Sequence, residues 1–357
     1  MAGRDGIATI RDVARIAGVS VSTVSRVING RADVAEATRQ AVIAAMEEVS
    51  YTVSPVALSL VGAPTRLIGV LARHLSEEFS SALLRGILEV GEQEGYDVLL
   101  TQSVRSRNQT SALMRSVCDG LVIVSPGLDM EPDLALIEKG RPVVFFERPK
   151  QLPESVVVTT TNREGERELI RYLIDLGHRR IGFVAGRMSL PSSRERLEGY
   201  QEALGEAGIS PDPELIVEGA YDRQSGLLAG RRLLGLAERP TAIAASNDLE
   251  AFGVLRAAQE AGLQVPEQLS VAGFDNIPMS EHVHPPLTTV HQPMYEMGIQ
   301  AARMLICWIE GERPEPSQVV LPAHLVLRAS CGPRPGSHPP HAGSAPELNN
   351  SARVETA

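Results

Sequence analysis

The sequence contains few cysteines, few aromatic residues and no long hydrophobic run. Its three cysteines, Cys118, Cys307 and Cys331, include no CxxC pair, so neither a disulfide framework nor a zinc ribbon is supported. Aromatic residues make up only 4% of the chain, which argues against long aromatic stacking platforms. No stretch approaches about 18 apolar residues without a charge, so we expect no membrane-spanning helix and no membrane partner. The start lacks the apolar core of a signal peptide, which predicts a reduced, cytoplasmic protein.

The net charge of −10 argues against a nucleic-acid binder when it is averaged over all 357 residues. The basic residues, however, are spread unevenly. Residues 4–31 hold five arginines and two aspartates, whereas residues 33–48 hold one arginine and four acidic residues. Residues 1–62 are therefore neutral in sum, and any contact with phosphate must come from the arginines near the start.

Residues 8–53 have the pattern of three short helices. Thr9 can cap the first helix, whose apolar residues repeat with helical spacing. Ser20 can cap a second helix that ends at Asn29, and a third helix extends over about residues 35–49. Two helices joined by a three-residue turn form the helix-turn-helix pattern.

The start of the second predicted helix carries side chains suited to reading DNA. Val21 can pack against a thymine methyl group, and Ser22 can hydrogen-bond a base edge or a phosphate. Arg26 lies one turn further on and can donate two hydrogen bonds to a guanine. Thr23 and Ser25, with backbone amides, are natural phosphate ligands. An ordinary three-helix packing unit explains the same spacing, so the spacing alone leaves both interpretations open.

Residues 54–65 read as a linker with one very short helix. Ser54 followed by Pro55 is a start signal, and the helix extends to about Leu60 before a glycine and a proline. One and a half turns are too few to be stable alone in water. We expect this helix to fold only against a partner.

Residues 66–330 alternate β-branched runs with helical stretches, which predicts parallel sheets with helices on both faces. About 265 residues exceed one ordinary core, so two lobes are expected. The expected strands are 67–71, 96–100, 121–124, 143–146, 181–185, 241–245 and 269–274. Residues 331–357 are rich in proline, glycine and serine, which predicts a disordered tail.

Residues 9–30 resemble the opening of the LacI/GalR family of bacterial transcriptional repressors. Residues 67–70, 176–183 and 265–275 match further family motifs in the family's order, and the resemblance covers about residues 8–330. It implies a small all-α helix-turn-helix head on a two-lobed α/β core of the periplasmic-binding-protein type. It also implies a homodimer that binds double-stranded operator DNA with palindromic symmetry and responds to a small-molecule effector.

The resemblance assigns roles to the linker. In the family it folds into a hinge helix on specific DNA, and a leucine that matches Leu60 wedges into the minor groove; the alternative is that Leu60 only contacts the core. Two residues depart from the family, because Leu58 replaces a usual basic residue and Ala35 a common capping serine. The candidate DNA-binding residues are Thr9, Ser20, Val21, Ser22, Thr23, Ser25, Arg26, Asn29 and Leu60.

The resemblance also implies where the lobes divide. Residues 287–293 resemble a strand that crosses between them. We expect the first lobe to comprise about residues 66–160 and 292–321, and the second about residues 161–290 and 322–330.

A two-lobed α/β core binds ligands at the carboxyl ends of its strands. Asp275 and Asn247 follow expected strands, Arg196 lies in the helix after another, and all three match positions that touch the effector in the family. Glu147 also follows a strand. A structural ion pair or core packing is the alternative for each. The candidate effector-binding residues are Phe79, Ser125, Arg148, Arg196, Tyr221, Asn247 and Asp275.

The identity of the effector stays open at this stage. Residues 75–79 stand where relatives usually carry an Asn-Pro pair. The site suits a neutral sugar, or its arginines suit a sugar acid.

Enzyme chemistry has little support. The sequence lacks GxGxxG after a strand, a GxxxxGK[ST] loop and a GxSxG elbow, so we expect neither an enzyme nor a cofactor. His282 and His284 form a lone HxH pair, a pattern that is more often a loop pair than a metal site, so no metal site is expected. The competing interpretation is a solute-binding protein without a regulatory role, which the added head disfavours.

Overall fold

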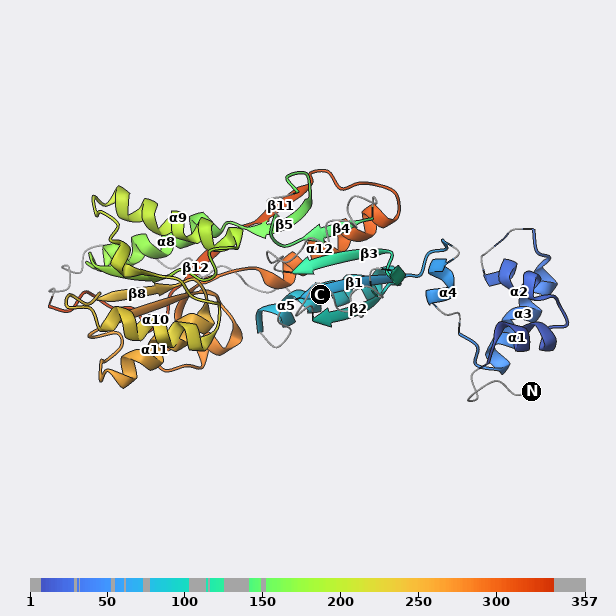
Figure 1. Cartoon of the computed structure of the whole chain (residues 1–357), viewed down its shortest axis with the longest axis horizontal. Helices are drawn as coiled ribbons and strands as arrows, with labels where there is room; N and C mark the ends of the chain where they lie inside the picture. Colours follow the sequence, from blue (N-terminus) through green and yellow to red (C-terminus); the bar gives the residue numbers. More distant parts are fainter. Residues whose placement is uncertain are drawn as a thin grey trace, which may run out of the picture.

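The computed structural model of the chain describes residues 8–28, 31, 33–52, 55–60, 62–72, 78–102, 114, 116–124, 141–148 and 152–336, without the side chains at 57, 60, 78, 79 and 102. Figure 1 shows a helical head, a short helix and two α/β lobes following one another along the long axis. This confirms the predicted fold class. Across the described ranges, no helix combines the length and the apolar character needed to cross a membrane.

Three helices form the head: α1 (Ile10–Ile16), α2 (Val21–Ile28) and α3 (Glu36–Glu48). Each contributes one fully buried valine, namely Val13, Val24 and Val42, to a small apolar core. These valines lie on the faces predicted from helical spacing. The three helices pack in pairs around them.

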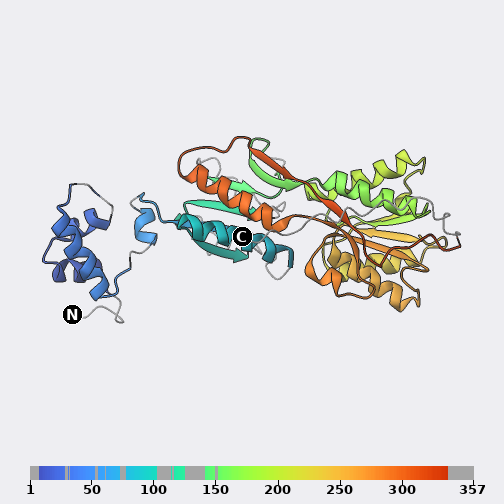
Figure 2. The same cartoon turned by 180° about the vertical axis from the view of Figure 1, so that it is seen from behind.

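A short helix, α4 (Pro55–Leu60), lies between the head and the first lobe in both views (Figures 1 and 2). Its first residue is a proline, whose fixed φ and missing N–H suit a helix start. The amide of Ala63 donates to the carbonyl of Leu58 at 3.0 Å and closes the helix. Val56 is 44% exposed, so this helix presents an apolar side chain to its surroundings.

The first lobe is built on a parallel six-stranded sheet in the order β11-β5-β4-β3-β1-β2. Its strands are β1 (Leu67–Ala72), β2 (Asp97–Gln102), β3 (Gly120–Val124), β4 (Val143–Phe145), β5 (Val156–Thr160) and β11 (Gln318–Leu321). Strands β1 and β3 are buried throughout, as continuous apolar runs in a covered parallel sheet should be. Helices α5 (Glu78–Glu94) and α12 (Met294–Ile309) pack together and against this sheet.

The second lobe is built on a sheet in the order β12-β10-β9-β8-β6-β7, in which only β12 runs antiparallel. Its strands are β6 (Ile181–Val184), β7 (Ile216–Val217), β8 (Ala242–Ala245), β9 (Ser270–Asp275), β10 (Thr288–His291) and β12 (His324–Val326). Its helices are α8 (Asn162–Asp175), α9 (Pro191–Glu206), α10 (Arg223–Leu234) and α11 (Asp248–Glu260), with the short 3-10 turns η1 (Pro213–Leu215) and η2 (Pro278–Glu281). The α8–α9 pair covers one face of the sheet, and the α10–α11 pair covers the other (Figure 1).

Within the described residues, the chain passes between the lobes three times. It leaves β5 into α8, leaves β10 into α12, and leaves β11 into β12. Each crossing therefore places a few residues between the two sheets, next to the carboxyl ends of β5, β10 and β11. This arrangement brings residues distant in sequence to the boundary between the lobes.

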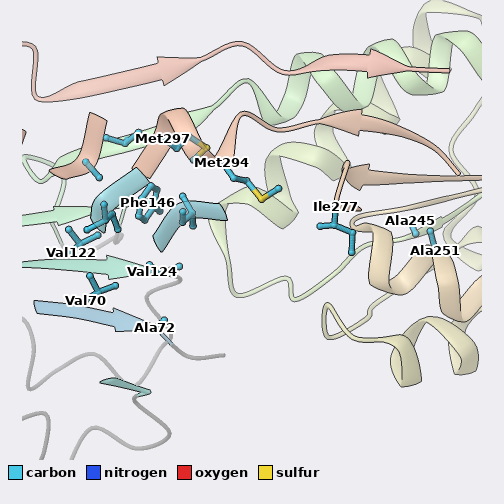
Figure 3. Packing of buried hydrophobic residues seen from close by; sticks show 14 of the residues in the cluster. Val70, Ala72, Val122, Val124, Phe146, Ala245, Ala251, Ile277, Met294 and Met297 are labelled. Atoms are coloured by element: carbon cyan, nitrogen blue, oxygen red, sulfur yellow. The ribbon is translucent and has the colours of Figure 1, made fainter. Parts of the chain in front are cut away.

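Apolar packing continues toward that boundary. Phe146 on the first-lobe side belongs to the same buried cluster as Met294, Met297 and Ile277. Figure 3 shows Met294, at the start of α12, between Phe146 and Ile277 of the second lobe. The boundary therefore has an apolar portion beside the polar groups described below.

The carboxyl-terminal segment departs from its prediction as a tail from residue 331. Cys331 and Gly332 are buried, and the amide of Gly332 donates to Ser270 Oγ at 3.1 Å. The amide of Arg334 donates to the carbonyl of Leu176 at 2.9 Å. Residues 331–336 thus pack on the second lobe, because their backbone groups find partners there. The rest of the predicted tail lies outside the described residues.

Helices α5 and α12 cross so closely that the contact has no room for a side chain. A Cβ at Gly298 would collide with the carbonyl oxygen of Leu83. Gly298→Ala must therefore push the helices apart. We expect it to lower the free energy of unfolding by about 1–3 kcal/mol, measured by urea denaturation of the purified protein.

Gly205→Ala on α9 is the matched control for this prediction. A Cβ at this exposed position meets nothing within 4 Å. Alanine should raise the stability by about 0.5–1 kcal/mol, because it lowers the chain entropy lost on folding. Equal stabilisation by both substitutions would contradict the close helix crossing.

Candidate functional site

Hydroxyl groups gather at the start of helix α2. The amide of Thr23 donates to Ser20 Oγ at 3.1 Å, so Ser20 caps the helix as predicted. Ser20 Oγ also lies 2.7 Å from Ser22 Oγ and 2.8 Å from Thr23 Oγ1. Val21 is 41% exposed beside them. An exposed helix start carries hydroxyl groups and backbone N–H groups that point outward along the helix axis. This combination suits an anionic ligand such as phosphate.

The remaining candidates in the head lie on either side of this cluster. Arg26 is exposed and forms an ion pair with Asp33, a contact that the sequence analysis did not anticipate. Ser25 lies on the same helix and is partly buried. Thr9 caps α1, where its amide and hydroxyl both donate to Asp12 and hold the pKa of that carboxyl below its usual value.

Two DNA-binding candidates are not placed at side-chain level. Leu60 is the last residue of α4, and its side chain lies outside the described part of the chain. Asn29 also lies outside the described residues. Their roles stay predictions.

Arg196 of α9 is the centre of the second candidate site. It is 3% exposed, and its Nε donates to Asn162 Oδ1 at 3.0 Å. Its Nη1 donates to the carbonyl of Ser246 and lies 3.8 Å from Asp275 Oδ1. The guanidinium also stacks over the ring of Phe274 at 3.7 Å from the centroid. We call Arg196 with these four neighbours the Arg196 cluster.

Asp275 enters the cluster from the end of β9. Its φ of 107° is a backbone conformation that side chains rarely adopt. Gln292, which follows β10, donates from Nε2 to Asp275 Oδ1 at 3.1 Å, and its amide donates to the carbonyl of Asp275 at 3.3 Å. Strained backbone of this kind costs about 1–3 kcal/mol and concentrates at binding sites.

Asn247 and Tyr221 lie beside the cluster. Asn247 caps α11 by accepting from the amide of Glu250 at 2.9 Å, and its Nδ2 donates to the carbonyl of Tyr221 at 3.3 Å. The Tyr221 ring packs over Gly186, where a Cβ would come within 2.6 Å of the ring carbon that carries the hydroxyl. The Tyr221 hydroxyl lies 2.7 Å from Ser193 Oγ, and burial raises its pKa to about 12.

One hydrogen bond links the two lobes directly at this site. Ser192 of α9 donates from Oγ to Glu147 Oε1 at 2.6 Å, and Glu147 follows strand β4 of the first lobe. Ser192 Oγ also lies 3.3 Å from the Tyr221 hydroxyl. The candidate site is thus continuous from the second lobe to the edge of the first.

The structure brings together four of the seven predicted effector-binding residues, namely Arg196, Asp275, Asn247 and Tyr221. Arg148 has other partners, because its guanidinium donates to the carbonyl of Ser155 at 3.1 Å and to Gln318 Oε1 at 2.9 Å. These bonds fasten it to the first lobe. Ser125 and the Phe79 side chain lie outside the described residues, so these two candidates stay predictions. No group of three metal-ligating side chains occurs within the described ranges.

Sequence reasoning missed Asn162 and Gln292. Asn162 lies two residues after the end of β5, Gln292 directly follows β10, and the chain crosses toward the other lobe after each of these strands. The rule used for Asn247 and Asp275, that ligand-facing groups follow strands, would have found Asn162 if residues 156–160 had been recognised as a strand. The same rule applied to the expected strand within residues 287–293 would have found Gln292. The signal was present, but the five-residue strand β5, which lies between β11 and β4, was not identified.

Several carboxylates around Arg196 are buried without enough partners. Both oxygens of Glu166, Oε2 of Glu147 and Oε2 of Glu250 accept no hydrogen bond from the protein. Burial raises the pKa of Glu166 and of Glu250 to about 8 and that of Glu147 to about 6. It also raises the pKa of Asp248, which accepts from Thr289 and from the amide of Ile277. Burial thus favours the protonated form of each of these carboxyls.

Two family models match parts of the chain. Residues 9–54 match the bacterial regulatory proteins of the lacI family, and residues 170–331 match the periplasmic binding protein-like domain. The first match covers the helical head and ends just before α4. The second covers most of the second lobe and α12.

Relatives match over nearly the whole chain. Catabolite control protein A of Priestia megaterium is 36% identical over 330 residues, which cover 90% of this chain and 98% of the relative. The HTH-type transcriptional repressor PurR of Photobacterium profundum is 33% identical over 329 residues, 91% of this chain and 98% of the relative. The second of these relatives is named as a transcriptional repressor.

Solved structures agree with the sequence matches. A lac repressor dimer bound to operator and the anti-inducer ONPF has a TM-score of 0.76 at 32% identity, covering 91% of this chain and 99% of that chain. A complex of the transcriptional regulator CelR with cellobiose has a TM-score of 0.71 at 34% identity, covering 90% and 99%. A helix-turn-helix head on a periplasmic-binding-protein-like core defines a DNA-binding regulator. The chain belongs to the LacI family of bacterial transcriptional regulators.

The raised pKa of Glu166 gives a pH-dependent prediction. The folded protein holds the proton up to about pH 8, whereas an ordinary glutamate loses it near 4.5. Folding is therefore progressively weakened as the pH rises between these values, at about 1.4 kcal/mol per pKa unit. Glu166→Gln removes this penalty, so its melting temperature should rise by several degrees relative to the parent as the pH increases from 5 to 8.5.

The control for this measurement is Glu164→Gln on the first turn of the same helix. Glu164 is exposed, so its substitution should give the same difference from the parent at both pH values. Melting temperatures of the parent and both variants, measured at pH 5 and pH 8.5, test the prediction. A pH-independent difference for Glu166→Gln would show that the carboxyl is ionised in the fold.

Proposed function

We propose that this protein is a transcriptional repressor that binds a palindromic operator as a homodimer. A small-molecule effector, a sugar or sugar derivative, binds at the Arg196 cluster between the lobes and changes the affinity for DNA. We assign it to the cytoplasm, where operator DNA is accessible. One observation carries this proposal. The same chain contains a helix-turn-helix head, in which the start of α2 is exposed, and the buried polar Arg196 cluster at the boundary between the lobes.

The DNA-binding half is supported by chemistry and by relatives. The start of α2 presents an exposed valine, three hydroxyl groups and its first backbone N–H groups to a ligand. The lac repressor structure with a similar fold is a dimer bound to operator. A two-fold dimer requires a two-fold operator, because each head must meet an equivalent half-site.

The effector half is supported by the position of the cluster. Arg196, Asp275 and Asn247 converge at the carboxyl ends of β8 and β9, where open α/β sheets bind ligands. The similar CelR structure is a complex with cellobiose. A polyhydroxylated ligand suits carboxylate, amide and guanidinium groups held in fixed positions.

Helix α4 provides the coupling between the two sites. Six residues are too few for stability in isolation, so small changes in its surroundings decide whether it forms. A ligand that binds one lobe arrangement better than another shifts that equilibrium. A coupling of about 1–3 kcal/mol corresponds to an affinity change of about 5- to 150-fold.

The alternative is a solute-binding protein without a regulatory role. This alternative explains the two-lobed core, but it gives the helical head no function. Selection of duplexes from a random DNA library, followed by anisotropy at physiological ionic strength, separates the two functions. A regulator enriches one symmetric sequence, whereas the alternative predicts no preference among duplexes.

Asp275→Asn tests the effector site. Asparagine keeps the side-chain shape and tolerates positive φ, but it removes the charge that strengthens hydrogen bonds to ligand hydroxyls. We expect effector affinity to fall by about tenfold or more while operator affinity without effector is unchanged. Asp175→Asn, exposed on α8, is the control. An unaltered effector response in Asp275→Asn would remove Asp275 from the site.

Leu60→Ala tests the wedge in the minor groove. Alanine is as good a helix former as leucine, so the substitution removes the wedge while favouring α4. We expect specific operator affinity to fall at least about tenfold, with non-specific affinity nearly unchanged. Val56→Ala in the same helix should change both little. Equal losses on operator and random duplex would reject the wedge.

A further inference from the structure

Arg26 lies on the outward face of helix α2. It follows Ser22 by one helical turn, so the two exposed side chains share a face, whereas Val24 and Val27 are buried in the core of the head. The Arg26 side chain is 57% exposed. Its guanidinium can therefore reach a duplex that the start of α2 contacts.

The chain after α2 turns back and brings Asp33 to this guanidinium. The amide of Arg31 donates to the carbonyl of Arg26 at 3.0 Å, and Arg39 of α3 donates from Nη2 to the carbonyl of Arg31 at 2.7 Å. Asp33 Oδ2 accepts from Arg26 Nη2. Hydrogen bonds that do not involve the carboxylate thus fasten the segment before Asp33 to both helices, so the ion pair alone does not place it there.

The ion pair of Arg26 with Asp33 differs from the two others in the described part of the head. Those two, at 3.4 and 3.7 Å, join residues three apart within α1 or within α3. Both partners of the Arg26–Asp33 pair are more than half exposed, and such a pair contributes little to stability. Asp33 also adds negative charge beside a surface proposed to bind phosphate, which weakens general attraction to DNA. Neither stability nor general attraction to DNA therefore explains this acidic side chain.

A guanidinium can serve a carboxylate and a base at the same time. It carries five N–H donors in one plane, and the contact with Asp33 is made through Nη2. The remaining donors suffice for O6 and N7 of a guanine, which together accept two hydrogen bonds. The carboxylate restricts the orientation of the arginine for this bidentate contact, and it competes with phosphate for the same positive charge.

We infer that Asp33 is a specificity-determining residue of the head. It orients Arg26 toward a guanine of the operator, and at other sequences it restrains the same guanidinium from binding phosphate. This inference rests on the proposed function and deepens it, because it assigns the selection of one base to a pair of residues instead of to Arg26 alone.

Asp33→Asn keeps the size of the side chain and removes its charge. Arg26 can then bind a phosphate on any sequence. We expect affinity for a random duplex to rise about threefold, and the slope of log affinity against log salt concentration to become steeper by about one unit. Discrimination at the guanine that Arg26 contacts should fall about tenfold, because the arginine is no longer oriented.

The test uses the full chain and the duplex that the parent enriches from a random library. Anisotropy measures affinity for this duplex, for versions in which each guanine is replaced in turn, and for a random duplex between about 50 and 200 mM salt. The position at which Arg26→Ala loses discrimination identifies the guanine that Arg26 contacts. Glu48→Gln, which removes an exposed negative charge at the end of α3, is the control and should leave discrimination there unchanged.

A double-mutant cycle separates the pair from a general effect of charge. Asp33→Asn should change neither discrimination nor salt dependence once Arg26 is alanine. The inference is overturned by unchanged discrimination in Asp33→Asn, by an equal loss in Glu48→Gln, by an effect of Asp33→Asn that persists without Arg26, or by an Arg26→Ala variant that keeps discrimination at every guanine. A parent that enriches no sequence gives a different result, because it contradicts the proposed function and the inference together.

Discussion

The guanidinium of Arg196 joins more parts of the second lobe than any other side chain described above. It holds the start of α8 through Asn162, the end of β8 through the Ser246 carbonyl, and the end of β9 through Asp275. A buried charge is tolerated only when it is paired and hydrogen-bonded, so these elements cannot separate without a large cost. This arrangement therefore fixes the start of α8 relative to the carboxyl ends of β8 and β9.

Two sets of contacts connect the surroundings of Arg196 to the first lobe. Glu147 accepts from Ser192 and joins the end of β4 to α9. Gln292 bonds Asp275 and belongs to the crossing between β10 and α12, the helix packed tightly on α5. A ligand that alters the cluster therefore acts on segments that cross between the lobes. The first lobe is the one that α4 precedes in the chain, which gives a physical path between ligand and DNA.

Much of the fold follows from local signals in the sequence. Thr9 with Asp12, Ser20 and Pro55 set helix starts by capping, and Gly95, Gly177 and Gly262 end helices with positive φ. The ends of expected strands indicated Asn247 and Asp275, and the helix after another strand indicated Arg196; the structure brings the three residues close together. The sequence analysis did not indicate Asn162, because residues 156–160 were not recognised as a strand. It also missed Gln292, and it did not indicate that Arg148 is held by the carbonyl of Ser155. Such partners depend on tertiary packing, which periodicity does not encode.

The central claim is that ligand binding at the Arg196 cluster and DNA binding at the head are energetically coupled. Because coupling is reciprocal, the factor by which a ligand changes operator affinity must equal the factor by which operator changes ligand affinity. The direct measurement is calorimetric titration of the ligand into the free protein and into its operator complex, beside operator titrations with and without ligand. The account predicts equal factors of about fivefold or more. Identical ligand affinities in the two titrations would contradict it.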